Sequence, residues 1–159
     1  MNKRAIIQKI TEKLASELEV YFRAAHASRT EATHESSKAE NKYDTRGLEA
    51  SYLARGQSKQ AAELEAAIAE FQKLVPKKFT DGDAIVIGAL VELEQLGEKN
   101  FYFIGPRAGG TEVIHDRKEI LVITPQSPLG EQLVSQKAGT TLQLKLGKEV
   151  RSAKIIRVE

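Results

Sequence analysis

The chain of 159 residues contains no cysteine and no tryptophan, and only 6% of its residues are aromatic. Without cysteine there can be neither a disulfide framework nor a thiolate metal site. No apolar run approaches the roughly eighteen residues that a membrane-spanning helix needs. The first residues also lack the apolar core of a signal peptide. We therefore expect a cytoplasmic protein with no membrane partner.

The chain also has little excess of charge of either sign. The 24 lysines and arginines nearly balance 22 aspartates and glutamates, which leaves a formal net charge of +2. An excess this small does not indicate duplex nucleic acid or an anionic membrane surface as the partner. We expect no sequence-specific DNA binding.

Proline and glycine are rare in the first half of the chain. All four prolines follow residue 75, and nine of the eleven glycines follow residue 80. Proline is nearly excluded from helix interiors and glycine weakens them. This asymmetry predicts a helical domain at residues 1–78 and a domain of strands and turns at residues 79–159. The boundary falls at Val75-Pro76-Lys77-Lys78, because Pro76 cannot continue a helix.

In the helical half, apolar residues recur every three or four positions along two arms, from Ile6 to about Ser36 and from about Gly47 to Leu74. This spacing is typical of a coiled-coil seam, and antiparallel pairing places the turn near residue 40. Arms of roughly 35 residues would extend on the order of 50 Å. The seam consists of Ile7, Ile10, Leu14, Leu18, Tyr21 and Ala25 in the first arm, and Leu53, Gln57, Ala61, Leu64, Ile68, Phe71 and Leu74 in the second.

The second half has the alternation and turn residues of an antiparallel sheet with five or six strands. Ser127 suits a helix N-cap and Pro128 the first helical position, which predicts one helix of about nine residues. The fold class is therefore α+β, a helical hairpin followed by a sheet domain. The predicted strands are Ala84–Leu93 (bent near Gly88), Asn100–Ile104, Val113-Ile114, Ile120–Ile123, Leu142–Leu146 and Ile155–Val158.

Common catalytic signatures are missing from the sequence. We find no phosphate-binding glycine loop, no Ser/His/Asp spacing and no cluster of metal ligands. His34-Glu35 lacks the second histidine that a zinc-binding helix needs. These observations give no support to nucleotide hydrolysis, serine-type catalysis or a resident zinc ion.

The whole chain resembles the Gre-type bacterial transcription elongation factors. The more specific part is the run Ile120-Leu-Val-Ile-Thr124, followed by Ser127-Pro128-Leu129-Gly130, Leu133 and Ala138-Gly139-Thr140. This order is similar to the family's strand, Ser-Pro helix and glycine turn before the last hairpin. The resemblance implies an FKBP-like sheet domain at residues 79–159.

That resemblance also implies a function. Gre factors bind bacterial RNA polymerase with the globular domain at the rim of the secondary channel, and they insert the helical hairpin toward the active centre. They act on stalled or backtracked complexes as accessory factors, with no cofactor of their own. In members that stimulate cleavage of the nascent RNA 3′ end, two carboxylates in an Asp-x-x-Glu-Asn pattern help to hold a second Mg²⁺. Carboxylate oxygen is the ligand that this ion prefers.

Glu40-Asn41 matches the Glu-Asn of that pattern, and Tyr43 lies close to the tyrosine that follows it. The aspartate position falls on Ser37, which supplies no anionic oxygen. Cleavage would therefore need Glu35 or Asp44 as the second acid beside Glu40. The resemblance implies Glu40 and Asp44 as metal ligands only within the polymerase active centre.

Two further sets of residues are candidates for contacts. The family's Ser-Pro loop touches polymerase, which implies a role for Ser127, Pro128 and Leu129, although Gln126 replaces the acid that often precedes this pair. The alternative is that Ser127-Pro128 only caps a helix. Positively charged side chains near the turn are candidates for RNA phosphate contacts, or they are simply solvated. These are Arg29, Arg46 and Arg55.

Three other functions stay open. A Gre-like protein that enters the channel and modulates or inhibits polymerase without cleavage is favoured by Ser37. An FKBP-like peptidyl-prolyl isomerase would need a concave, aromatic-lined pocket, but strand alternation divides Phe101, Tyr102 and Phe103 between two faces. A purely structural coiled-coil adaptor would not explain the polar, charge-mixed segment between the arms.

Overall fold

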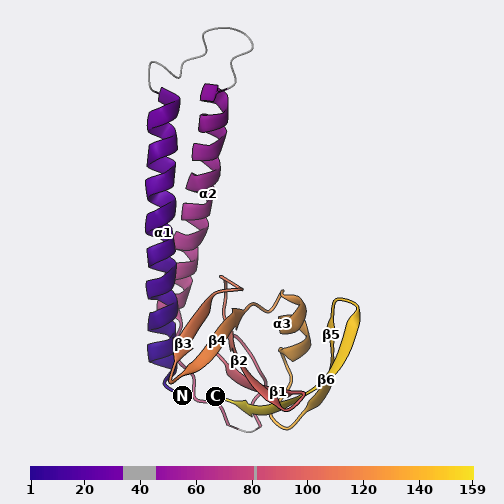
Figure 1. Ribbon diagram of the computed structural model, residues 1–159. Coiled ribbons are helices and arrows are strands. Elements are labelled where there is room, and N and C mark those ends of the chain that lie inside the picture. The colour runs from indigo at the N-terminus through magenta and orange to yellow at the C-terminus, as the bar shows by residue number, and fades with distance from the viewer. Residues whose placement is uncertain (34–45, 81) are drawn as a thin grey trace. The chain divides into compact units, whose positions relative to one another are not determined.

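The computed structural model describes residues 1–33, 46–80 and 82–159 (Figure 1). Two long helices, α1 (Lys3–Thr33) and α2 (Arg46–Lys73), precede a six-stranded sheet that carries one short helix, α3 (Pro128–Leu133). The chain divides into two compact units. We call Met1–Thr11 with Ala69–Glu159 the sheet unit and Glu12–Ile68 the helical unit. None of the helices in the described ranges combines the length and the apolar composition that crossing a membrane requires.

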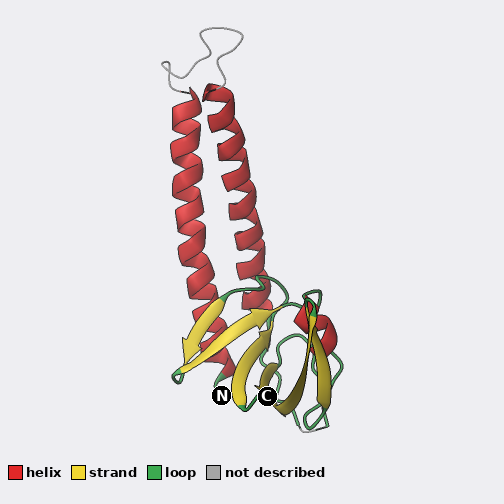
Figure 2. Ribbon diagram, turned by 45° about the vertical axis from the view of Figure 1, so that its right-hand side comes forward, coloured by secondary structure: helices red, strands yellow, loops and turns green. Residues whose placement is uncertain are grey.

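Within the helical unit, α1 and α2 run side by side (Figures 1 and 2). Leu14 and Ala61 are at most 3% exposed, which agrees with their places in the predicted seam, and Ala67, which we did not assign to the seam, is also 3% exposed. Leu53 is an exception, because 55% of its surface is exposed although we assigned it to the seam. The complete coiled-coil hairpin stays a prediction, because its turn lies outside the described residues.

The first turns of α1 and the last turn of α2 belong to the sheet unit. Ile6, Ile10 and Phe71 are fully buried there, and the ring centroid of Phe71 lies 6.2 Å from that of Phe103 in the sheet. The helix bases thus cover apolar side chains of the sheet. The predicted domain boundary after residue 78 stays a prediction, and the compact units divide within the helices.

The sheet has the strand order β3-β4-β2-β1-β6-β5. Four neighbouring pairs are antiparallel, but β2 and β4 are parallel, so the prediction of an antiparallel sheet was wrong for this pair. The strands are β1 (Leu90–Gln95), β2 (Glu98–Ile104), β3 (Glu112–His115), β4 (Lys118–Ile123), β5 (Thr141–Leu146) and β6 (Glu149–Val158).

Tight turns explain the parallel pair. The loop after β2 passes the end of β4, where the Gly105 amide donates to the Ile123 carbonyl and the Gly110 amide to the Val122 carbonyl, both at 2.8 Å. The chain then forms β3 at the edge, and the two-residue turn Asp116-Arg117 returns it as β4 beside β2. Both turn residues have positive φ, 51° and 61°, as a type I′ hairpin requires.

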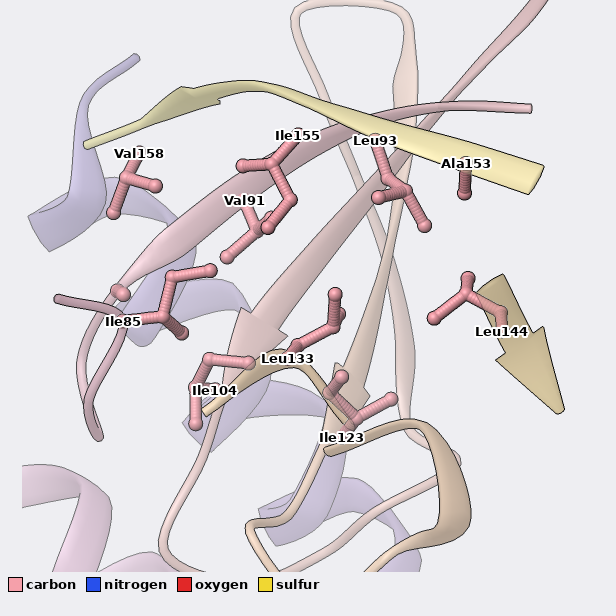
Figure 3. Packing of buried hydrophobic residues seen from close by; sticks show 11 residues of the cluster. Ile85, Val91, Leu93, Ile104, Ile123, Leu133, Leu144, Ala153, Ile155 and Val158 are labelled. Carbon is pink, nitrogen blue, oxygen red and sulfur yellow. The ribbon is translucent and has the colours of Figure 1, made fainter. Parts of the chain in front are cut away.

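One face of the sheet packs against α3 (Figure 3). Strand alternation brings Val91, Leu93 and Ile155 to this face, where they surround Leu133 of α3. The residues labelled in Figure 3 are at most 5% exposed: Ile85, Val91, Leu93, Ile104, Ile123, Leu133, Leu144, Ala153, Ile155 and Val158.

The predicted strand at Ala84–Leu93 begins only at Leu90. Gly88 has a φ of +88° and its amide bonds to the Ile104 carbonyl, so the chain turns here instead of continuing as a strand. Ile85 exchanges backbone hydrogen bonds with the segment after α3, donating to Gln136 and accepting from Ser135. The apolar run reflects burial of Ile85 and Ala89, not a continuous strand. The predicted nine-residue helix is also shorter, with six residues.

Two glycines should respond oppositely to an added methyl group. Gly56 lies inside α2 with no atom within 4 Å of an added Cβ, so Gly56→Ala should stabilise the protein by about 0.5–1 kcal/mol. At Gly105 the Cβ would lie 2.8 Å from both the Phe71 ring and the Val122 side chain, so Gly105→Ala should cost about 1–3 kcal/mol. Urea unfolding measures both, and equal effects of the two changes would contradict the packing described here.

Candidate functional site

The best-defined candidate site is the turn that joins β4 to α3. The Ser127 hydroxyl donates to the Thr124 carbonyl at 2.7 Å and accepts from the Gly130 amide at 3.1 Å. Ser127 has extended backbone angles and is the N-cap of α3, with Pro128 at the helix start. The predicted cap is therefore confirmed. Both hydrogen-bonding functions of the hydroxyl are used within the turn.

Gly130 makes this turn possible. A Cβ at this position would lie 1.9 Å from the Thr124 carbonyl oxygen and 2.8 Å from the Ser127 hydroxyl oxygen. Since the nearest obstacle is backbone, no side-chain rearrangement could make room. The residue after Ser-Pro-Leu must be glycine for steric reasons, not because the local φ is positive.

The three predicted contact residues differ in accessibility. Pro128 is exposed, whereas Ser127 is half-buried. Leu129 is also half-buried and packs against the core cluster under α3. The surface that this turn offers to a partner is therefore mainly the Pro128 ring, with Gln126 and Glu131 as exposed polar neighbours. A polymerase contact by these residues stays a prediction.

A side-chain amide that the sequence did not indicate holds α3 to the sheet. Gln132 accepts from the Lys145 amide of β5 at 2.7 Å and donates to the Lys145 carbonyl at 3.1 Å. Its amide nitrogen also donates to the Pro128 carbonyl at 2.7 Å. Gln132 thus pairs with the edge strand as another strand would, and it fixes the first turn of α3. A glutamine in a short helix gives no sequence signal for such a bond.

The predicted arginine and acid candidates lie elsewhere. Arg29 is in α1, Arg46 begins α2 and Arg55 is an exposed residue of α2. Glu35, Glu40 and Asp44 fall outside the described residues, as do Ser37 and the other positions matched to the acid pattern. Among the residues that are described, no three histidine, aspartate or glutamate side chains lie together as metal ligands would.

A hollow on the sheet bears on the isomerase alternative. It has a volume of about 200 Å³ and is lined by Asn100, Phe101, Tyr102, Glu112, Glu119 and Leu121. Burial raises the pKa of the Tyr102 hydroxyl above its ordinary value. Phe103 is fully buried and packs against Phe71 instead. The hollow is smaller than the roughly 300–1,000 Å³ typical of small-molecule sites and has a polar rim.

Comparison with protein-family models and with curated proteins gives no match. Solved structures do match. The crystal structure of GreA factor homolog 1 (Gfh1) of Thermus thermophilus has 23% sequence identity and a TM-score of 0.40, covering 94% of this chain and 94% of that chain. The crystal structure of Thermus aquaticus Gfh1 has 23% identity and a TM-score of 0.41, covering 95% and 94%. The first is by name a homologue of GreA, and the second carries the same short name, Gfh1.

Substitutions in the turn should separate its steric and hydrogen-bonding requirements. Ser127→Ala removes the cap and should cost about 1 kcal/mol of stability. Gly130→Ala places a methyl group against backbone and should cost at least as much as the upper end of the about 1–3 kcal/mol typical of overpacking. Chemical denaturation gives both values. If Gly130→Ala were the milder of the two, the close approach to Thr124 would be wrong.

Proposed function

We propose that this protein is an accessory transcription factor that binds bacterial RNA polymerase in the cytoplasm. In this proposal the sheet unit provides the docking contact, through the turn at Ser127, Pro128 and Leu129. The residues between α1 and α2 then act at the polymerase active centre, reached through the secondary channel. The target is a stalled or backtracked elongation complex. Polymerase itself remains the catalyst.

The observation that carries the docking part is the set of hydrogen bonds and close contacts that define the Ser-Pro turn. The Ser127 cap, the absence of a side chain at Gly130 and the Gln132 bonds to Lys145 hold the backbone in one geometry, with the Pro128 ring exposed. A preorganised contact loses little conformational entropy on binding. This turn is also the part of the chain in which the resemblance to Gre factors is most specific.

The chemical part rests on the acids between the helices. In the proposal, Glu40 and Asp44, with Glu35 as the other candidate, share a Mg²⁺ ion with the polymerase active centre. That ion would orient the water that cuts backtracked RNA. Exposed Arg55, together with Arg29 and Arg46, would contact phosphates near the nascent RNA 3′ end. The protein holds no cofactor of its own in this scheme.

Ser37 supports a second version of the same function. With serine where the family pattern has aspartate, one of two anionic ligands is missing unless Glu35 or Asp44 replaces it. A factor without the second acid would occupy the channel and modulate or inhibit polymerase by position alone. The isomerase function has less support, because the hollow beside Tyr102 is small and rimmed by two carboxylates.

An RNA cleavage assay on a purified backtracked complex with Mg²⁺ distinguishes these versions. If the protein stimulates cleavage, Glu40→Ala should abolish shortening of the RNA, and either Asp44→Ala or Glu35→Ala should do the same. Glu63→Ala, at an exposed position of α2, is the matched control and should cleave normally. No shortening by the unaltered protein, despite measurable binding, would establish the non-cleaving version.

Docking is tested separately. Pro128→Glu changes the exposed ring without touching the hydrogen bonds of the turn, and it should weaken binding to polymerase about tenfold or more with little change in stability. Leu96→Ser, at a position 81% exposed in another turn, serves as the control. If Pro128→Glu binds polymerase normally, Ser127-Pro128 is a helix cap only.

A further inference from the structure

The sheet unit contains a groove that the proposed function does not use. It has a volume of about 310 Å³ and lies between the first turns of α1 and the segment that ends α2. Its deepest side chains are apolar, because Phe71 is fully buried and Ile7 is 9% exposed. The lining consists of Arg4, Ile7, Gln8, Thr11, Phe71, Gln72, Leu74 and Pro76.

Exposed apolar side chains extend this surface. Val75, between two lining residues, is 83% exposed, while Val86 and Ile87 are 42% and 43% exposed. These last two precede Gly88, whose added Cβ would lie 3.7 Å from the Leu74 side chain, so this turn abuts the edge of the groove. Single exposed apolar residues are common on proteins, but several beside an apolar groove mark a binding surface.

The border of this surface is basic. The lining includes Arg4, which is exposed, and it includes no acidic residue. Next to Arg4 in the sequence, Lys3 donates a hydrogen bond to the Lys77 carbonyl. The ammonium groups of Lys3 and Lys77 lie over the Phe79 ring, at 4.4 Å and 5.2 Å from its centroid. Burial lowers the pKa of Lys3, and the carboxylate of Glu159 opposes that effect.

Nearby acidic side chains are engaged with other partners. Glu70 forms an ion pair with Arg107, and Glu159 pairs with Arg157 at 3.1 Å. Asp83 accepts two hydrogen bonds from Thr80 and lies 3.9 Å from Lys77. An approaching segment therefore meets apolar surface bordered by Arg4 and the Lys3-Lys77 pair, with Glu70, Asp83 and Glu159 already engaged by other groups.

We infer that this groove binds a peptide segment of a partner protein that carries both acidic and apolar side chains. One or two apolar side chains would fill the space above Phe71 and contact Val75 and Ile87. Carboxylates beside them would pair with Arg4, which favours an acidic segment over a basic one. Single-stranded nucleic acid fits less well, because no exposed aromatic ring lines the groove to stack on bases.

Selection of peptides from a random twelve-residue phage library against the full chain tests this inference. We expect the enriched peptides to have a net negative charge and at least one large apolar residue. As purified fluorescent peptides they should bind Arg4→Glu and the double variant Val75→Ser, Ile87→Ser about tenfold more weakly than the unaltered protein. Because these positions are exposed or at the border, the variants should unfold normally. Added salt should weaken binding as well.

Leu96→Ser is again the control and should bind the peptides normally, since Leu96 lies in the β1–β2 turn. A peptide in which glutamates are replaced by lysine should lose affinity for the unaltered protein and regain it for Arg4→Glu. The inference is overturned if no peptide is enriched, if the enriched peptides are neutral or basic, or if the groove variants bind equally well. Binding of single-stranded RNA or anionic vesicles that depends on Val75 and Ile87, in place of peptide binding, would also overturn it.

Discussion

The sheet unit depends on covering both apolar faces of one six-stranded sheet. On one face, Val91, Leu93 and Ile155 pack around Leu133 of α3 (Figure 3). On the other, Phe103 meets Phe71, and Gly105 leaves room for that ring to reach Val122. A single six-residue helix cannot cover two faces, so the first turns of α1 and the last turn of α2 are needed as the second layer. This requirement explains why residues 1–11 and 69–73 fold with the strands.

The two edge strands are protected by side chains rather than by further strands. At β5, the Gln132 amide occupies both backbone groups of Lys145. At β3, the Lys9 ammonium donates to the Ile114 carbonyl at 2.6 Å. Unpaired strand edges invite pairing with other chains, and lysine is a common means of preventing it. Both protecting residues come from the helices that cover the faces, so covering the faces and blocking the edges are achieved by the same elements.

The sequence predicted those features of the fold that depend on the residue types within a short segment. The distribution of proline and glycine separated the helical and strand-rich parts, and Ser127-Pro128 identified the start of α3 together with its cap. It did not predict the parallel β2–β4 pair, which depends on which strand fills the space beside β2 after the Asp116-Arg117 turn. It also placed the start of the first strand too early, at Ala84 instead of Leu90, because burial of Ile85 and Ala89 produces the same apolar run as a strand would. For the candidate site, residue types located the turn, but only packing separates exposed Pro128 from Leu129.

The Ser-Pro turn and the basic-bordered groove place different demands on the sequence. At the turn, the essential contacts involve backbone, since Gly130 approaches the Thr124 carbonyl and Gln132 bonds to the Lys145 main chain. Such contacts fix the shape but leave the exposed ring of Pro128 free to change. At the groove, Arg4, Val75 and Ile87 contribute through exposed side chains, so their chemistry can vary without altering the core. Under both proposals, partner specificity would change by substitution of exposed residues, while Gly130 and Phe71 are constrained by folding alone.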